Sequence, residues 1–118
     1  MSTTNTYVHP KRIKERPIQT LTGATDAIRF SKGDVFIINR SGAVNQTTLA
    51  VPVAWTDDWR QLWIVNGATQ ANTITVASGL GGSAKATITF ASTLDANVLL
   101  QAYGGYWYVI GGNDVTIS

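Results

Sequence analysis

The chain reads NTITV over residues 72–76 and KATITF over residues 85–90, and these two stretches decide the fold class. In both, every second residue is apolar, so that Ile74, Val76, Ile88 and Phe90 fall on one side of an extended chain and threonines on the other. An α-helix would scatter the same residues around its axis. Both stretches are therefore predicted to be β-strands with one face in a core and one face in water.

Short apolar runs recur along the rest of the chain at intervals of about 8–12 residues, separated by turn residues. This spacing is typical of β-sandwiches and barrels. We predict an all-β fold, a jelly-roll-like antiparallel β-sandwich over residues 17–118 that follows an extended arm of residues 1–16. The predicted strands are residues 18–22, 27–30, 35–39, 47–53, 61–66, 73–77, 86–90, 98–103, 107–110 and 115–117.

Two of these strands do not alternate. Residues 35–38 read VFII and residues 98–100 read VLL, and continuous apolar runs are typical of strands that are covered on both faces. In a chain of this length, we expect the second cover to come from another subunit, although a loop lying over a central strand would give the same pattern.

Trp55, Trp59 and Trp63 are spaced four residues apart, which would place them on one face of a helix. However, residues 62–65 read LWIV and precede an Asn-Gly turn, as a strand would. We therefore expect a loop or a single helical turn over residues 54–59.

The composition argues against most kinds of enzymatic catalysis. The 118 residues are 44% hydrophobic and 14% charged, and they include no cysteine, one histidine (His9) and one glutamate (Glu15). Thiolate nucleophiles and thiolate zinc sites are therefore excluded, and few groups remain to transfer a proton. We expect no enzymatic activity, no metal and no cofactor.

Two other features could suggest a site. Asp57 and Asp58 could join Asp34 or Asp95 around calcium, but no spaced series of oxygen ligands surrounds them, so a solvated turn is preferred. The glycine-rich residues 79–85 lack the Lys-Ser/Thr pair and the following helix of a phosphate-binding loop, so a hairpin connection is expected.

The basic residues are concentrated at the N-terminus, where residues 1–16 carry four basic side chains and one acidic one. Such an arm could contact an acidic protein surface or phosphate, or it could be a solvated tail. Binding to nucleic acid is disfavoured because neither interleaved aromatic residues nor a recognition helix accompany the charges. The sequence shows no secretory signal and no stretch suited to spanning a membrane.

From residue 34 to residue 112, short motifs follow one another in a particular order. They are TLAVP at 48–52, LWIVN at 62–66, NTITV at 72–76, GLGGS at 79–83, NVLL at 97–100 and GGYWYVIGG at 104–112. In this order they resemble a small β module of bacteriophage virion proteins, found in head decoration (cement) proteins, tail fibres and tailspikes. The resemblance implies a non-catalytic structural or attachment module that assembles as a homotrimer.

The shortness of the chain and its basic arm favour a capsid decoration protein on the virion surface, which would bind the major capsid protein and stabilise the head. The alternative is a fibre or tailspike module that recognises host-surface glycans. The arm residues expected to bind the capsid are Tyr7, Val8, His9, Lys11, Arg12, Ile13, Lys14 and Arg16.

The aromatic residues near the C-terminus are the last candidates. Alternation places Trp107 and Val109 on one face, with Tyr106, Tyr108 and Ile110 on the other. One face should fill the core, with Trp107 as its anchor, and the other could be a subunit interface, ordinary surface or a platform for stacking glycans. The residues expected in the trimer interface or the core are Phe36, Ile38, Leu99, Tyr106, Trp107, Tyr108 and Ile110.

Overall fold

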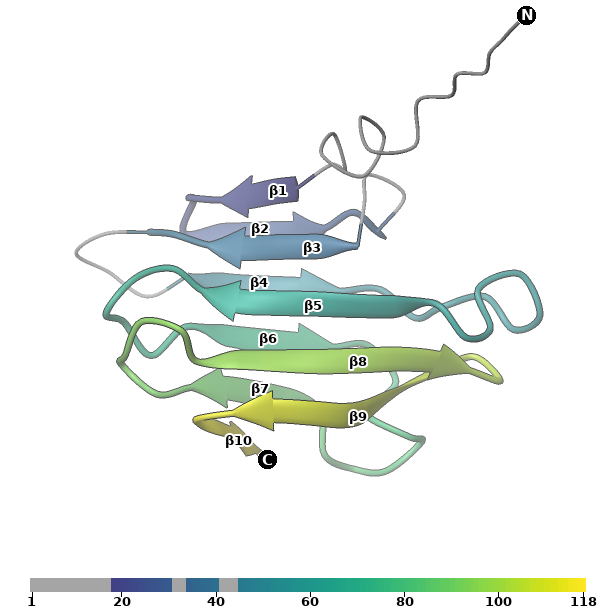
Figure 1. The fold of residues 1–118 in the computed structure, drawn as a ribbon. Coiled ribbons are helices and arrows are strands. Elements are labelled where there is room, and N and C mark those ends of the chain that lie inside the picture. Colours follow the sequence, from purple (N-terminus) through teal and green to yellow (C-terminus); the bar gives the residue numbers. More distant parts are fainter. Residues whose placement is uncertain (1–17, 31–33, 41–44) are drawn as a thin grey trace, which may run out of the picture.

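A computed structural model describes residues 18–30, 34–40 and 45–118 of the chain. Within these residues the all-β prediction is confirmed, and each predicted strand has a counterpart (Figure 1). The strands are β1 (Ile18–Leu21), β2 (Thr25–Ile28), β3 (Val35–Ile38), β4 (Gln46–Leu49), β5 (Gln61–Asn66), β6 (Thr73–Val76), β7 (Thr87–Phe90), β8 (Asn97–Tyr103), β9 (Tyr106–Asn113) and β10 (Val115–Ile117).

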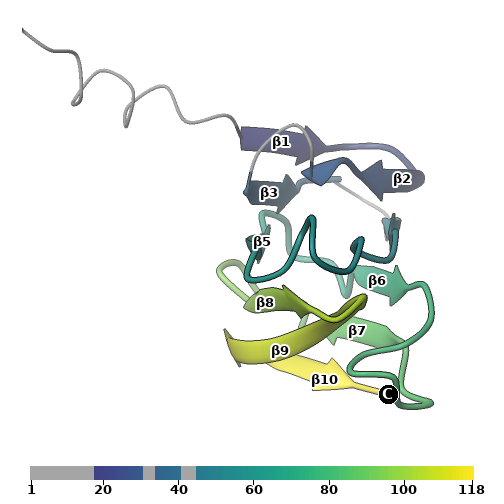
Figure 2. The same ribbon diagram turned by 90° about the vertical axis from the view of Figure 1, so that its right-hand side faces the viewer.

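The strands form two five-stranded sheets that pack face to face. Sheet A has the order β1-β3-β5-β8-β9, and sheet B has the order β10-β7-β6-β4-β2. Figure 2 shows the two sheets as neighbouring layers. The predicted division into a sandwich with two layers is therefore supported.

The predicted antiparallel jelly-roll topology is wrong, because both sheets are mixed. In sheet A, β1, β3 and β5 pair in parallel, and in sheet B, β2, β4 and β6 do the same. The chain passes from one sheet to the other after each of its first five strands, so successive circuits stack in the manner of a β-solenoid. Only the pairings that involve β7 to β10 are antiparallel.

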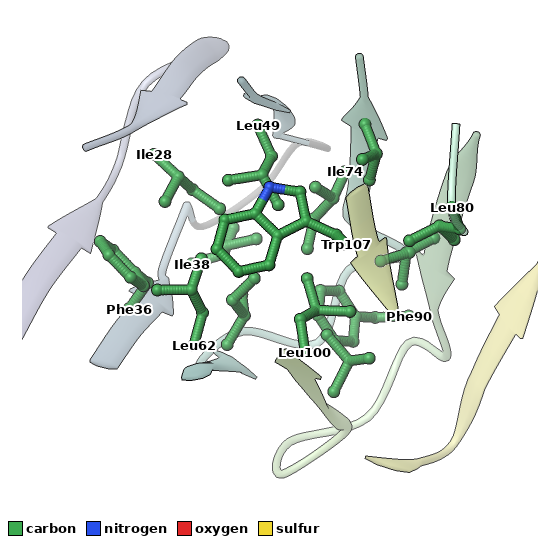
Figure 3. Close-up of a cluster of buried hydrophobic side chains, with 14 of the residues drawn as sticks. Ile28, Phe36, Ile38, Leu49, Leu62, Ile74, Leu80, Phe90, Leu100 and Trp107 are labelled. Atoms are coloured by element: carbon green, nitrogen blue, oxygen red, sulfur yellow. The ribbon is translucent and has the colours of Figure 1, made fainter. Parts of the chain in front are cut away.

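The core lies between the sheets and is built from alternate residues of almost every strand. Trp107 on β9 lies at its centre and is completely buried (Figure 3). Its indole and the Phe30 ring are in edge-to-face contact, with ring centroids 5.5 Å apart and an interplanar angle of 79°. Its Nε1–H donates to the carbonyl oxygen of Ala50 at 2.9 Å, so the polar atom of this large side chain is satisfied in the interior.

A network of three fully buried asparagines lies where β4 and β6 begin and β5 ends. The side chain of Asn72 accepts from the backbone N–H of Asn45 at 2.7 Å and donates to Oδ1 of Asn66 at 2.7 Å. Asn66 in turn donates to the backbone carbonyls of Gln70, Ala91 and Thr93. The network thus ties together turns that are distant in sequence.

Candidate functional site

The outer face of sheet A carries an apolar row that crosses all five strands. The strand register places Ile18, Val35, Trp63, Leu99 and Gly111 side by side in that order. Trp63 is 47% exposed and Ile18 is 56% exposed. The non-alternating runs in β3 and β8 are therefore explained: one half of each run faces the core and the other half belongs to this outer face.

A hollow of about 410 Å³ lies on the same face beside Trp63. Since Gly111 has no side chain, the row ends in a gap on β9, beyond Leu99 and two strands from the indole of Trp63. Asp34 is the one charged residue of the lining, and it lies 3.6 Å from the guanidinium of Arg60. The residues that line the hollow are Asp34, Val35, Gln61, Trp63, Asn97, Leu99, Gly111 and Gly112.

The outer face of sheet B has a different character. Its outward positions lie in two cross-strand rows that are mostly threonine, and none of them is charged or aromatic. Threonine hydroxyls can exchange hydrogen bonds with water, so this face suits solvent. The rows are Thr25, Gln46, Thr73, Thr89 and Thr116, and Ala27, Thr48, Thr75 and Thr87.

The seven residues expected in the core or the trimer interface lie in different parts of the structure. Phe36, Ile38 and Trp107 are completely buried between the sheets. Leu99 belongs to the apolar row on the outer face of sheet A. Ile110 is 46% exposed.

Ile110 is the extra residue of a β-bulge, since Leu100 pairs with Val109 and the next residue back, Leu99, pairs with Gly111. Beyond a bulge, the inward and outward positions are exchanged. The predicted alternation therefore fails from Ile110 onward. Val109 pairs with the core residue Leu100 and so lies on the side of Trp107, as expected, but it is 39% exposed on this edge strand.

Tyr106 and Tyr108 lie against the glycine-rich turn between β6 and β7. A Cβ atom added to Gly81 would come within 3.0 Å of the Tyr108 ring, and one added to Gly82 within 3.4 Å of the Tyr106 ring. Glycine thus allows these rings to approach the backbone closely. Each tyrosine is about 40% exposed, so part of its surface is covered by the chain itself.

An aromatic cleft at one end of the sandwich was not anticipated. The loop from β4 to β5 and the turn from β8 to β9 lie at the same end (Figure 1), and Gly104 N–H of the turn donates to Asp58 of the loop at 2.9 Å. The Trp59 and Tyr103 rings are in contact, with centroids 4.9 Å apart at 37°. Together with Ala54 and Trp55, these residues line a cleft of about 360 Å³.

The loop holds its tryptophans in a strained backbone conformation. The φ angle is 71° at Trp55 and 72° at Trp59, a region that bulky residues rarely occupy and that costs roughly 1–3 kcal/mol each. Trp55 is 90% exposed and Trp59 is 65% exposed. The expectation of a loop over residues 54–59 is confirmed, but the three tryptophans do not share a face, because Trp63 lies on sheet A.

Asp57 and Asp58 hold this loop in place. Asp57 accepts a hydrogen bond from Val53 N–H at 2.7 Å, and Asp58 accepts the bond from Gly104 described above. Among residues 18–30, 34–40 and 45–118, no group of three or more His, Cys, Asp or Glu side chains could hold a metal ion. The carboxylates therefore serve the loop backbone in this structure.

The expected capsid-binding residues, Tyr7 to Arg16, lie outside the described residues. In the described part of the chain, no helix is long and apolar enough to cross a membrane. No protein-family model and no curated protein sequence matches the chain.

Proposed function

We propose that this chain is a non-catalytic structural protein of a bacteriophage virion, a capsid decoration protein that assembles as a homotrimer on the major capsid protein. The order of its sequence motifs supports the virion role. The assembly is supported by the apolar row on the outer face of sheet A, because Ile18 and Trp63 are about half exposed there and their neighbours Val35 and Leu99 are partly exposed in the described chain.

The absence of charge on this row suits contact between identical copies. Two copies bring the same charges to their interface, so a face rich in one sign would repel itself. None of the five residues of the row carries a charge. The adjacent hollow beside Gly111 offers space for a side chain of a neighbouring copy.

The number of apolar side chains in the row also suits association between copies. Burying one large apolar side chain contributes about 1.5–3 kcal/mol, whereas association costs at least about 4 kcal/mol in lost translational and rotational freedom. A single residue is therefore insufficient. Each side chain of the row contributes only in proportion to the area that is still exposed, so association needs Ile18, Val35, Trp63 and Leu99 together, with Ile37 and Val65 in the adjoining row adding to them.

In this proposal, residues 1–16 bind the surface of the capsid. Ordering an extended segment costs about 1–2 kcal/mol per residue in backbone entropy, so charge attraction alone is insufficient. The apolar side chains of Tyr7, Val8 and Ile13 would add contacts that the four basic residues cannot provide.

Recognition of glycans through the C-terminal aromatic hairpin has less support. Its largest ring, Trp107, is completely buried and cannot stack on a sugar. Tyr106 and Tyr108 are partly covered by the glycine-rich turn. We therefore prefer the decoration role to glycan recognition by this hairpin.

The experiment that tests the proposal compares the full chain with a variant lacking residues 1–16, using phage heads stripped of this protein. Both should have the mass of a trimer by light scattering, and only the full chain should sediment with the heads. Electron microscopy of the loaded heads should show threefold density. Equal sedimentation of both proteins would refute the role of the arm, and failure of the full chain to bind would refute the decoration role.

A further inference from the structure

We propose that the aromatic cleft formed by Trp55, Trp59, Tyr103 and Asp58 is a binding site for an uncharged carbohydrate. This site lies at one end of the sandwich and is separate from the apolar row on sheet A. The inference does not depend on the decoration role, and its ligand would be the neutral pyranose units of a polysaccharide.

The exposed rings give the first argument. A pyranose ring has apolar C–H faces and a polar rim of hydroxyl groups, so it can stack on an aromatic ring while its hydroxyls remain hydrogen-bonded. Trp55 is 90% exposed and Trp59 is 65% exposed, and Trp59 is already paired with Tyr103 at a centroid distance of 4.9 Å. Most of the surface of both indoles is therefore not used by the fold, although the Trp59 ring also contacts Tyr103.

The backbone of the loop gives the second argument. Both tryptophans have positive φ angles, which the loop maintains against their steric preference. Asp57 N–H donates to Val53 O at 2.8 Å, and Trp59 N–H donates to Ala102 O at 2.7 Å. The exposed rings are thus mounted on a braced loop, and a preformed site loses less freedom when a ligand binds.

The size of the cleft fits a small part of a saccharide chain. Its volume of about 360 Å³ lies near the lower end of the range for ligand pockets, which is roughly 300–1,000 Å³. The cleft is lined by Ala54, Trp55, Asp58, Trp59, Tyr103 and Gly104.

The polar group of the cleft selects the class of ligand. None of the six lining residues is basic, and Asp58 carries the only carboxylate among them. A carboxylate accepts hydrogen bonds, so it pairs with hydroxyl groups and repels acidic sugars. Proline-rich peptides also dock on aromatic grooves, but proline has no N–H to donate to a carboxylate. Neutral sugars are therefore the better match.

The four tryptophans allow a direct test on the full chain. The indole N–H signals of ¹⁵N-labelled protein are recorded during titration with three uncharged hexasaccharides, maltohexaose, cellohexaose and hexa-N-acetylchitohexaose. At least one of these should shift the signals of Trp55 and Trp59 in a saturable manner. The signals of Trp63 and Trp107 should stay in place, and the buried Trp107 also reports that the protein remains folded.

Substitutions then locate the site. Trp55→Ala and Trp59→Ala should each weaken binding on the order of tenfold, whereas Trp63→Ala should leave it unchanged. Asp58→Asn keeps an oxygen that can accept from Gly104 but removes the charge, so it should raise the affinity for hexagalacturonate relative to the neutral sugars.

Three results would each overturn the proposal. These are no shift at about 10 mM of any neutral hexasaccharide, unchanged sugar affinity in Trp55→Ala and Trp59→Ala, or saturable binding of a decaproline peptide at the cleft without binding of sugar. Failure of the chain to associate or to bind capsids would leave these readouts unaffected.

Discussion

The indole Nε1–H of Trp107 donates to the carbonyl oxygen of Ala50 at 2.9 Å. This bond joins the centre of the core to the residue that follows β4, where the loop bearing the aromatic cleft begins. Trp107 therefore has two roles, since it fills the space between the sheets and fixes the start of that loop.

Trp107→Phe should lower the free energy of unfolding by about 1–3 kcal/mol, because the hydrogen bond to Ala50 is lost and the smaller ring leaves part of the indole's space empty. Trp107→Ala should cost more, about 3–5 kcal/mol, because nearly the whole space becomes a cavity. Urea denaturation followed by circular dichroism measures both values. Equal stability of Trp107→Phe and the parent protein would contradict the assigned hydrogen bond.

The asparagine network predicts a second loss of stability. Asn72→Ala removes the acceptor for Asn45 N–H and the donor to Asn66, and each unsatisfied buried group costs about 1–3 kcal/mol. Asn113→Ala is the matched control, because Asn113 is exposed on an edge strand. Thermal unfolding should show a clear decrease for Asn72→Ala and little change for the control, and equal melting temperatures would count against the network.

Two glycines with positive φ should respond differently to alanine. A Cβ at Gly79 would lie 2.2 Å from the carbonyl oxygen of Ser83, whereas a Cβ at Gly104 would meet nothing within 4 Å. Gly104→Ala should therefore cost only the conformational penalty of about 1–2 kcal/mol. Gly79→Ala should cost more because its backbone must also shift. Denaturant midpoints that fall equally for both would show that the turn at Gly79 relaxes freely.

Increasing salt concentration should affect the association of the copies and the binding of the arm to the capsid differently. Contacts between uncharged sheet faces are barely screened, whereas binding of a basic arm to the capsid weakens as ionic strength rises. Light scattering in increasing sodium chloride should therefore show an unchanged mass, while sedimentation with phage heads should decrease. Dissociation of the assembly by salt would contradict an apolar interface.

The strand positions could be predicted from the sequence because alternation and turn residues are local signals. β5 and β10 were predicted with their observed bounds. The strand pairing could not be predicted in this way. The turn between β1 and β2 shows that the chain reverses, but the same turn chemistry serves a hairpin within one sheet and a crossing to the opposite sheet.

The candidate sites were predictable only in part. The apolar run in β3 predicted a strand covered on both faces, with another subunit or a loop as the second cover, and the register places Val35 of that strand beside Trp63. The cleft depends on the meeting of Trp59 with Tyr103, which are 44 positions apart in the chain and have no sequence pattern in common. The available signal was three tryptophans near Asp57 and Asp58, an unusual density of large rings in a polar stretch.

The most direct test of the central claim is the mass of the full chain in solution, measured by multi-angle light scattering together with two lysine variants. The parent protein should have three times the chain mass of 12.7 kDa. Trp63→Lys places like charges on the apolar row and should give a folded monomer, whereas Thr75→Lys on the outer face of sheet B should remain a trimer. A parent protein that is monomeric at micromolar concentration, or a Trp63→Lys variant that keeps the trimer mass, would contradict association through sheet A.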